Sequence, residues 1–222
     1  MKITLLCNAG LMLEYDNRIL LVDAINGECP PFYTLSDDEF EKLCFNYDVS
    51  SKICGLYFTH VHPDHYDQKK VDRFRRMYPE VPIFLPTNVT CGSTFYMGPF
   101  LIQYQPFPHA PIPNAPDHVV TWIEAGECSV YIPADAALDA TKHLSFVDNR
   151  KASIGIWNAM YLSRAETRSL IHRTADRNYI YHMPLEKDDT IGIWRKCRLN
   201  LERYQEELRD IIIMEKYPSV IL

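Results

Sequence analysis

The residues best suited to chemistry lie together at positions 59–65, which read THVHPDH. This stretch holds three imidazoles and one carboxylate, and both groups are good ligands for zinc and similar divalent ions. Side chains two positions apart in an extended chain point the same way, so His60 and His62 can bind one ion together. Asp64 and His65 follow where the chain turns, so they can serve a second ion.

The elements around this stretch determine how firmly it is held. The apolar run at residues 53–58 predicts a buried strand that ends just before His60. A helix is predicted over residues 67–78, where Pro79 helps to stop it. The stretch is therefore expected to form a short loop at the end of a core strand, which is a rigid place for a metal site. A chance gathering of surface histidines is the alternative.

The pattern His-x-His-x-Asp-His after an apolar strand resembles the signature of the metallo-β-lactamase-fold hydrolases. This resemblance implies an αβ/βα sandwich, an α/β fold in which two β-sheets lie face to face with helices outside and metals at one edge. At 222 residues the chain suits one domain, and we expect residues 1–222 to form it. The family also takes metal ligands from segments far from the motif.

A proline-rich stretch at residues 107–118, FPHAPIPNAPDH, offers two histidines for the first ion. Its four prolines restrict the path of the chain and reduce the entropy lost on presenting a side chain. The resemblance implies that one histidine from this region is the third ligand of the first metal. His109 is expected, because it closely follows the incoming strand. His118 remains the alternative, and it could instead contact substrate or cap the next strand.

Two later residues match the remaining ligand positions of the family. Asp135 follows the apolar run 128–133, where the family places a carboxylate shared by two ions. The family usually has glycine before this aspartate and often threonine after it, whereas here both neighbours are alanine. Asp135 as the N-cap of the following segment is another reading, and it does not exclude ligation. His182 ends the short predicted strand 178–181 and matches the last ligand, which belongs to the second metal.

The ligand set implied by the resemblance, with Asp135 between the two ions, is His60, His62, Asp64, His65, His109, Asp135 and His182. Two divalent cations are expected there, zinc first, with manganese or iron as alternatives. Such a pair activates water for attack on a carbonyl or phosphoryl centre. Asp64 is also the candidate general base that orients this water. The sequence therefore predicts a metal-dependent hydrolase of a small ester, lactone or phosphodiester.

Two further polar residues are expected close to the metals. Asp23 ends the apolar run 19–22, where a carboxylate costs energy unless it is paired. The resemblance implies that Asp23 braces the metal loop by hydrogen bonding to its backbone, and a plain turn aspartate is the alternative. Asn158 directly follows the predicted strand 154–157 and is expected to line the site.

Composition narrows the range of partners. The net charge of −6 argues against nucleic acid, because phosphate backbones require a basic face. The seven cysteines are scattered without a Cys-x-x-Cys pair, which indicates reduced thiols in a cytoplasmic protein. No signal peptide or membrane-spanning run is visible. We therefore expect a small-molecule substrate and no membrane partner.

Two other uses of the same site remain open. A nucleic-acid phosphodiesterase of this fold is disfavoured by the acidity and by the lack of an inserted arm long enough to grip RNA. A non-hydrolytic use would be a metal-dependent binding module or redox chemistry with iron. Redox use on this fold generally requires a flavin partner and favours an acidic ligand in place of one histidine, so His62 speaks against it.

The C-terminal part predicts one long helix over residues 189–214, with apolar positions spaced by three and four. This apolar helix face indicates packing against the core, with a dimer interface as the alternative. The sequence therefore leaves a homo-oligomer open. Residues 220–222 are expected to form an edge strand or a tail.

Two other histidines are interpreted as having no chemical role: His143 on the surface of a helix over 139–148, and His172 inside a helix over 163–175.

Overall fold

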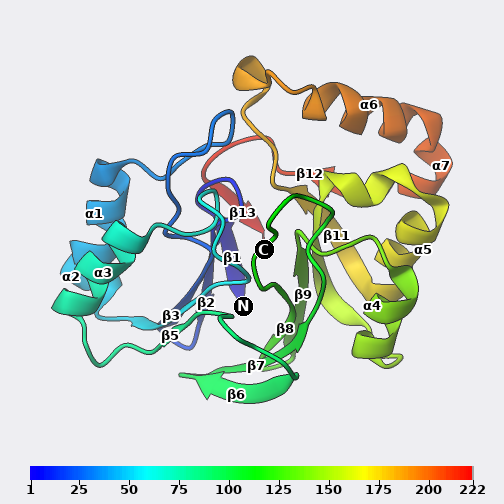
Figure 1. The fold of residues 1–222 in the computed structure, drawn as a ribbon. Helices are drawn as coiled ribbons and strands as arrows, with labels where there is room; N and C mark the ends of the chain where they lie inside the picture. Colours follow the sequence, from blue (N-terminus) through cyan, green and yellow to red (C-terminus); the bar gives the residue numbers. More distant parts are fainter. Residues whose placement is uncertain (222) are drawn as a thin grey trace.

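The computed structural model describes residues 1–221, and in it two β-sheets pack face to face with helices on both outer sides (Figure 1). One sheet has six strands in the order β13-β1-β2-β3-β4-β5. The other has seven strands in the order β12-β11-β10-β9-β8-β7-β6. The expected αβ/βα sandwich is therefore confirmed. Among the described residues, no helix has the length and apolar character needed to cross a bilayer.

The N-terminal part of the chain builds most of the six-stranded sheet. Its strands are β1 (Lys2–Leu5), β2 (Leu11–Tyr15), β3 (Arg18–Val22), β4 (Ile53–Tyr57), β5 (Ile83–Phe84) and β13 (Ser219–Ile221). The helices that cover it are α1 (Asp37–Phe45), α2 (Tyr47–Ser50) and α3 (Gln68–Met77). The first three strands form an antiparallel meander, whereas β3, β4 and β5 run parallel.

The second half of the chain builds the seven-stranded sheet. Its strands are β6 (Ser93–Met97), β7 (Phe100–Pro106), β8 (Val119–Ala125), β9 (Cys128–Ala134), β10 (Ala152–Asn158), β11 (Ala175–Tyr181) and β12 (Ile211–Ile213). The helices on this side are α4 (Ala140–Val147), η1 (Ala159–Ser163), α5 (Ala165–Thr174), η2 (Glu186–Asp188), α6 (Ile193–Arg203) and α7 (Gln205–Leu208). Strands β7, β8 and β9 are antiparallel, so the loops 107–118 and 135–139 emerge at the same edge.

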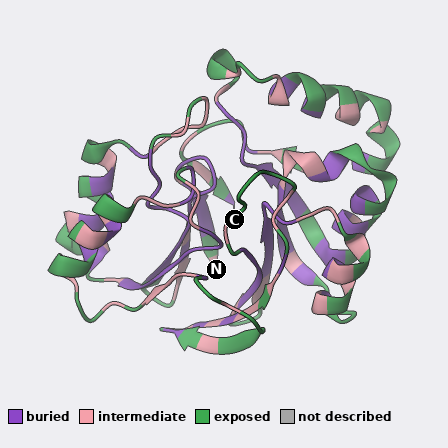
Figure 2. Ribbon diagram, in the orientation of Figure 1, coloured by how far each residue is buried: buried purple, intermediate pink, exposed green. Residues whose placement is uncertain are grey.

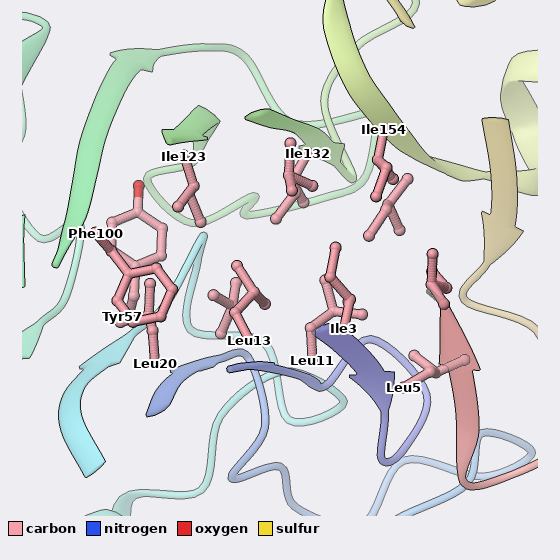
Figure 3. Packing of buried hydrophobic residues seen from close by; sticks show 14 of the residues in the cluster. Ile3, Leu5, Leu11, Leu13, Leu20, Tyr57, Phe100, Ile123, Ile132 and Ile154 are labelled. Carbon is pink, nitrogen blue, oxygen red and sulfur yellow. The ribbon is translucent and has the colours of Figure 1, made fainter. Parts of the chain in front are cut away.

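The main core lies between the two sheets. Leu11 and Leu13 of β2 face Ile123 and Ile132 of the opposite sheet (Figure 3). Residues of β3 alternate, because side chains of a strand point to opposite faces. Leu20 packs between the sheets, whereas its neighbours pack under the helices. Both faces of these strands are therefore buried, and the exposed surface falls mainly on the helices and connecting loops (Figure 2).

The predicted long helix over residues 189–214 is wrong in its last part. Helix α6 ends at Arg203, and after the short α7 the chain forms β12, which pairs in parallel with β11. The run Ile211-Ile212-Ile213 is β-branched throughout, and it meets the free edge of β11. The expected last strand is present as β13 on the edge beside β1, and residue 222 lies outside the described residues.

The interpretation of His143 as a surface residue is also wrong. It lies on α4 but is fully buried, and its ring stacks on Phe107 at 4.2 Å between centroids. Its hydrogen-bond partners, Tyr131 and Tyr161, come from distant segments, so inspection of the local sequence could not find them.

Candidate metal centre

Residues from four segments meet at one edge of the sandwich. Potential ligand atoms form two groups of four, and the atoms of each group lie within 4.8 Å of one another. The first group is His60, His62, His109 and Asp135, and the second is Asp64, His65, Asp135 and His182. The motif follows β4, whereas the other members follow β7, β9 and β11. Only Asp135 belongs to both groups.

One oxygen of Asp135 lies at the middle of the cluster. Its Oδ2 is 3.8 Å from Nε2 of both His60 and His109. The same oxygen is 3.6 Å from Nε2 of His65 and 3.4 Å from Nε2 of His182. A carboxylate in this position can contact ions held by either group.

Backbone geometry explains how these side chains reach the centre. Asp23, Ala134 and His182 have φ angles of 50°, 48° and 59°, and each lies at or directly beyond a strand end. The left-handed region turns the chain sharply and costs free energy for residues other than glycine, so its use often marks a functional site. The family's usual glycine before the shared carboxylate suits this conformation, and here Ala134 adopts it.

The loop of His109 and the turn of Asp135 are joined by backbone contacts. Ala110 donates its N–H to the carbonyl oxygen of Asp135 at 2.7 Å, and Ala137 donates to Pro108 at 2.8 Å. His109 also forms an isolated antiparallel bridge with Ala136. These contacts fix the third histidine of the first group relative to the shared carboxylate.

Asp23 orients two of the histidines. Its carboxylate accepts the backbone N–H and the hydroxyl of Thr59 at 2.8 and 2.6 Å, and the Nδ1–H of His65 at 3.0 Å. Because Thr59 gives its only hydroxyl proton to Asp23, its oxygen accepts the Nδ1–H of His60 at 3.0 Å. Both rings therefore carry a proton on Nδ1 and turn Nε2 to the centre, where a bound cation would displace any proton from that nitrogen.

His109 has the same tautomer for a separate reason. Its Nδ1 lies 2.7 Å from the carbonyl oxygen of Ala110, which can only accept. The Nε2 atoms of His60 and His109 are buried and have no hydrogen-bond partner among the residues that the structure describes. Across the second group, Nε2 of His65 and Nε2 of His182 are 3.0 Å apart. Buried ring nitrogens that point at one another and at carboxylates suit a divalent cation, because imidazole nitrogens and carboxylate oxygens are its usual ligands.

The charges of the centre depend on this close packing. Burial lowers the pKa of His60 well below its usual value, and the nearby His65 lowers it further. Burial opposes the charged form of His65, but the carboxylates of Asp64 and Asp23 outweigh it and raise that pKa to about 10. Burial also opposes ionisation of Asp64, yet His65 and His182 hold its pKa at about 2. The carboxylate of Asp64 is therefore ionised at neutral pH and attracts cations.

Two of the predicted residues lie beside these groups. His118 belongs to neither group, although its ring centroid is 5.0 Å from that of His60 and 5.6 Å from that of His109. The geometry thus places His109 rather than His118 among the potential ligands. Asn158 donates its side-chain N–H to Oδ1 of Asp135 at 2.7 Å, which leaves Oδ2 for the centre.

The sequence-based reasoning missed Asn8 and Thr59. Asn8 lies after β1, is fully buried, and donates to Oδ2 of Asp64 at 3.1 Å. Thr59 links Asp23 to His60, as described above. Each is a polar residue that follows an apolar strand, as Asp23 does. The same sequence signal could therefore have pointed to both.

No family model and no curated protein sequence matches the chain. Among solved structures, the metallo-β-lactamase fold protein YhfI from Bacillus subtilis is 17% identical with a TM-score of 0.68, over 99% of this chain and 98% of that one. An isothiocyanate hydrolase from Delia radicum gut bacteria is 14% identical with a TM-score of 0.64, over 100% and 99% of the two chains.

A third similar structure is CmlA, a diiron β-hydroxylase from Streptomyces venezuelae. It is 14% identical with a TM-score of 0.62, and the match covers 99% of this chain but 53% of that one. At such identities the likeness concerns the fold, and the chemistry must be inferred from the site itself.

Proposed function

We propose that this chain, which has the metallo-β-lactamase fold, is a metal-dependent hydrolase of a small ester, lactone or phosphodiester. The observation that carries the proposal is the convergence of two groups of four potential ligands that share Asp135. The hydrolases among the similar structures support this choice of reaction class. The acidic net charge of −6 favours a small substrate over a nucleic acid.

The residues of the two groups have distinct roles in this proposal. His60, His62 and His109 would hold the first cation. Asp64, His65 and His182 would hold the second, and Asp135, which belongs to both groups, would serve both. Asn158 and Asp23 hold these ligands in position, through Asp135 and through the tautomers of His60 and His65.

Bound divalent cations supply Lewis acidity and lower the pKa of water toward neutrality. Asp64 contributes a carboxylate that stays ionised, because His65 and His182 oppose the effect of burial on its pKa. An ionised carboxylate accepts hydrogen bonds and has no proton to donate, so Asp64 would orient the attacking water by accepting a hydrogen bond from it. Closely packed side chains exclude bulk water from the buried ligands, which strengthens these electrostatic interactions.

Zinc is the cation we propose, with manganese as the alternative, since the donor set contains imidazole and carboxylate but no thiolate. The similarity to CmlA favours iron-dependent oxidation as a second candidate function, because that protein is diiron. The two candidates differ in the metal bound, so metal content separates them.

A cytoplasmic location also belongs to this proposal. All seven cysteines are free, although Cys7 and Cys44 are buried and Cys91 is exposed. Burial raises the pKa of the Cys7 and Cys44 thiols to about 12, which keeps them protonated and unreactive. Free thiols suit a reducing compartment.

The test is metal analysis of protein purified without added metal, followed by assays of the same sample on lactones, esters and phosphodiesters. We expect about two cations per chain and turnover of at least one class, and His60→Ala should lose the cation of the first group together with the turnover. His172→Ala is the matched control, because His172 lies on α5 outside both groups. Stoichiometric iron without hydrolysis would favour iron-dependent oxidation. A metal-free protein that still turns over substrate would contradict both candidate functions, because each requires a metal.

A further inference from the structure

A cavity of about 390 Å³ lies beside the first ligand group. It is lined by the loop between β7 and β8 and by α4, and its polar lining residues include His109, His118, Lys142 and Asp117. His109 lines the cavity and also belongs to the first ligand group, so the two sites are adjacent. The volume falls within the usual range for pockets that bind small molecules.

His118 is a buried polar group without a hydrogen-bond partner among residues 1–221. The residue is one of those that line the cavity, it is only 3% exposed, and both Nδ1 and Nε2 are buried without a partner in this part of the chain. In either protonation state an imidazole carries at least one N–H donor. Buried donors are nearly always satisfied in native proteins, so the acceptor for His118 is expected to come from outside the chain.

Lys142 provides a positive charge at the same cavity. Its ammonium lies 4.5 Å from the centroid of the Phe107 ring, and among residues 1–221 it forms no ion pair. The contact with the ring holds the ammonium close to the cavity without neutralising it. A hydrogen-bond donor and a free cation that line one cavity suit an oxygen-bearing anion.

We propose that this cavity binds a carboxylate or phosphate group of the substrate, through the N–H of His118 and the ammonium of Lys142, while the scissile bond lies at the metal centre. The proposal rests on the proposed function and narrows it to substrates with an anionic group. Asp117 also lines the cavity, but it is exposed and its carboxylate accepts the backbone N–H of Asn88 at 2.8 Å. Its charge therefore lies toward the solvent side.

The first experiment compares paired substrates on the metal-loaded full chain. One arm sets 4-nitrophenyl hydrogen glutarate against the neutral 4-nitrophenyl valerate, and the other sets a phosphate-bearing ester against its hydroxyl analogue. For wild type we expect the anionic member of at least one pair to have the higher kcat/KM. In Lys142→Ala this preference should fall about tenfold, mainly through KM, whereas Lys69→Ala, an exposed charge on α3, should keep it.

Variants of His118 separate anion binding from metal binding. His118→Phe keeps a ring of similar size without a donor, and we expect it to retain both cations and to lose the preference for the anionic substrate. His118→Asn restores an N–H and should recover part of that preference. Loss of a cation in His118→Phe would overturn the proposal, because it would make His118 a ligand. An unchanged preference in both His118→Phe and Lys142→Ala would overturn it as well.

A binding measurement distinguishes failure of this inference from failure of the proposed function. Glutarate and inorganic phosphate are titrated calorimetrically into wild type and Lys142→Ala, each in the metal-loaded and the metal-free form. Binding to metal-free wild type that is weakened in Lys142→Ala supports the cavity even if no ester is hydrolysed. Hydrolysis of neutral and anionic esters at equal rates, with no anion binding, supports the hydrolase and rejects the cavity.

Discussion

Two buried clusters in this molecule contain histidine, and they differ in what surrounds the ring nitrogens. In the cluster around His143, Tyr131 donates its hydroxyl to Nδ1 at 2.6 Å. The Nε2 of His143 lies 3.1 Å from the carbonyl oxygen of Ala137 and 2.9 Å from the hydroxyl of Tyr161. In the metal centre, Nε2 of His60 and of His109 has no partner.

The difference shows which buried imidazoles need a ligand. A buried polar atom without a partner costs about 1–3 kcal/mol, so the chain alone stabilises the His143 cluster but not the metal centre. An unpartnered nitrogen is not sufficient by itself, because His172 also has one and belongs to neither ligand group. Convergence of several such atoms on one point distinguishes the metal centre.

The largest effect is expected where the two ligand groups meet. Asp135→Ala removes the only residue common to both groups, so we expect loss of at least one cation and a decrease in kcat of about 10³-fold or more. Metal content and steady-state kinetics measure both changes. Asp176→Ala is the matched control, because that aspartate forms an exposed ion pair with Lys151 and belongs to neither ligand group. Full metal content in Asp135→Ala would contradict the shared role.

A smaller effect is expected from the residue that sets the tautomers. Asp23→Asn keeps the shape of the side chain but cannot accept all three N–H and O–H groups, so cation affinity should fall about 10- to 100-fold. Thr59→Val removes the hydroxyl that links Asp23 to His60 but keeps the backbone N–H to Asp23, so it should lower the cation affinity of the first group more than that of the second. Titration of metal-free protein with Co²⁺, followed by absorption, measures the two affinities. Equal weakening of both sites in Thr59→Val would argue against this connection.

The fold class could be predicted because the local motif His-x-His-x-Asp-His carries the resemblance that implies it. The same resemblance named Asp23, Asp135 and His182 at the ends of apolar runs, and the structure brings these residues together at one edge of the sandwich. The strand β12 was missed because helical spacing of apolar residues continued into it, and only pairing with β11 decides its conformation. His143 was misplaced for a similar reason, since burial of a helix residue depends on the sheet it packs against.

The His143 cluster should be important for stability and unimportant for metal binding. His143→Phe keeps the stacking on Phe107 but leaves the hydroxyl of Tyr131 buried without an acceptor, so the free energy of unfolding should fall by about 1–3 kcal/mol. Urea denaturation of metal-free protein at neutral pH measures this change. Metal content should remain that of wild type, and loss of a cation would mean that this cluster also supports the turn of Asp135.

The same variant has a predicted pH dependence. Burial lowers the pKa of His143 to about 4, below the usual value of 6.5, although its contact with the Ala137 carbonyl opposes this shift. The unfolded chain therefore binds more protons than the folded chain between these values, and stability decreases as the pH falls from about 6.5 to about 4. One proton corresponds to at most about 1.4 kcal/mol per pH unit. His143→Phe lacks this contribution, so its stability deficit should be largest above pH 6.5 and should shrink toward pH 4. Parallel stability curves for the two proteins would show that His143 is not held neutral by the fold.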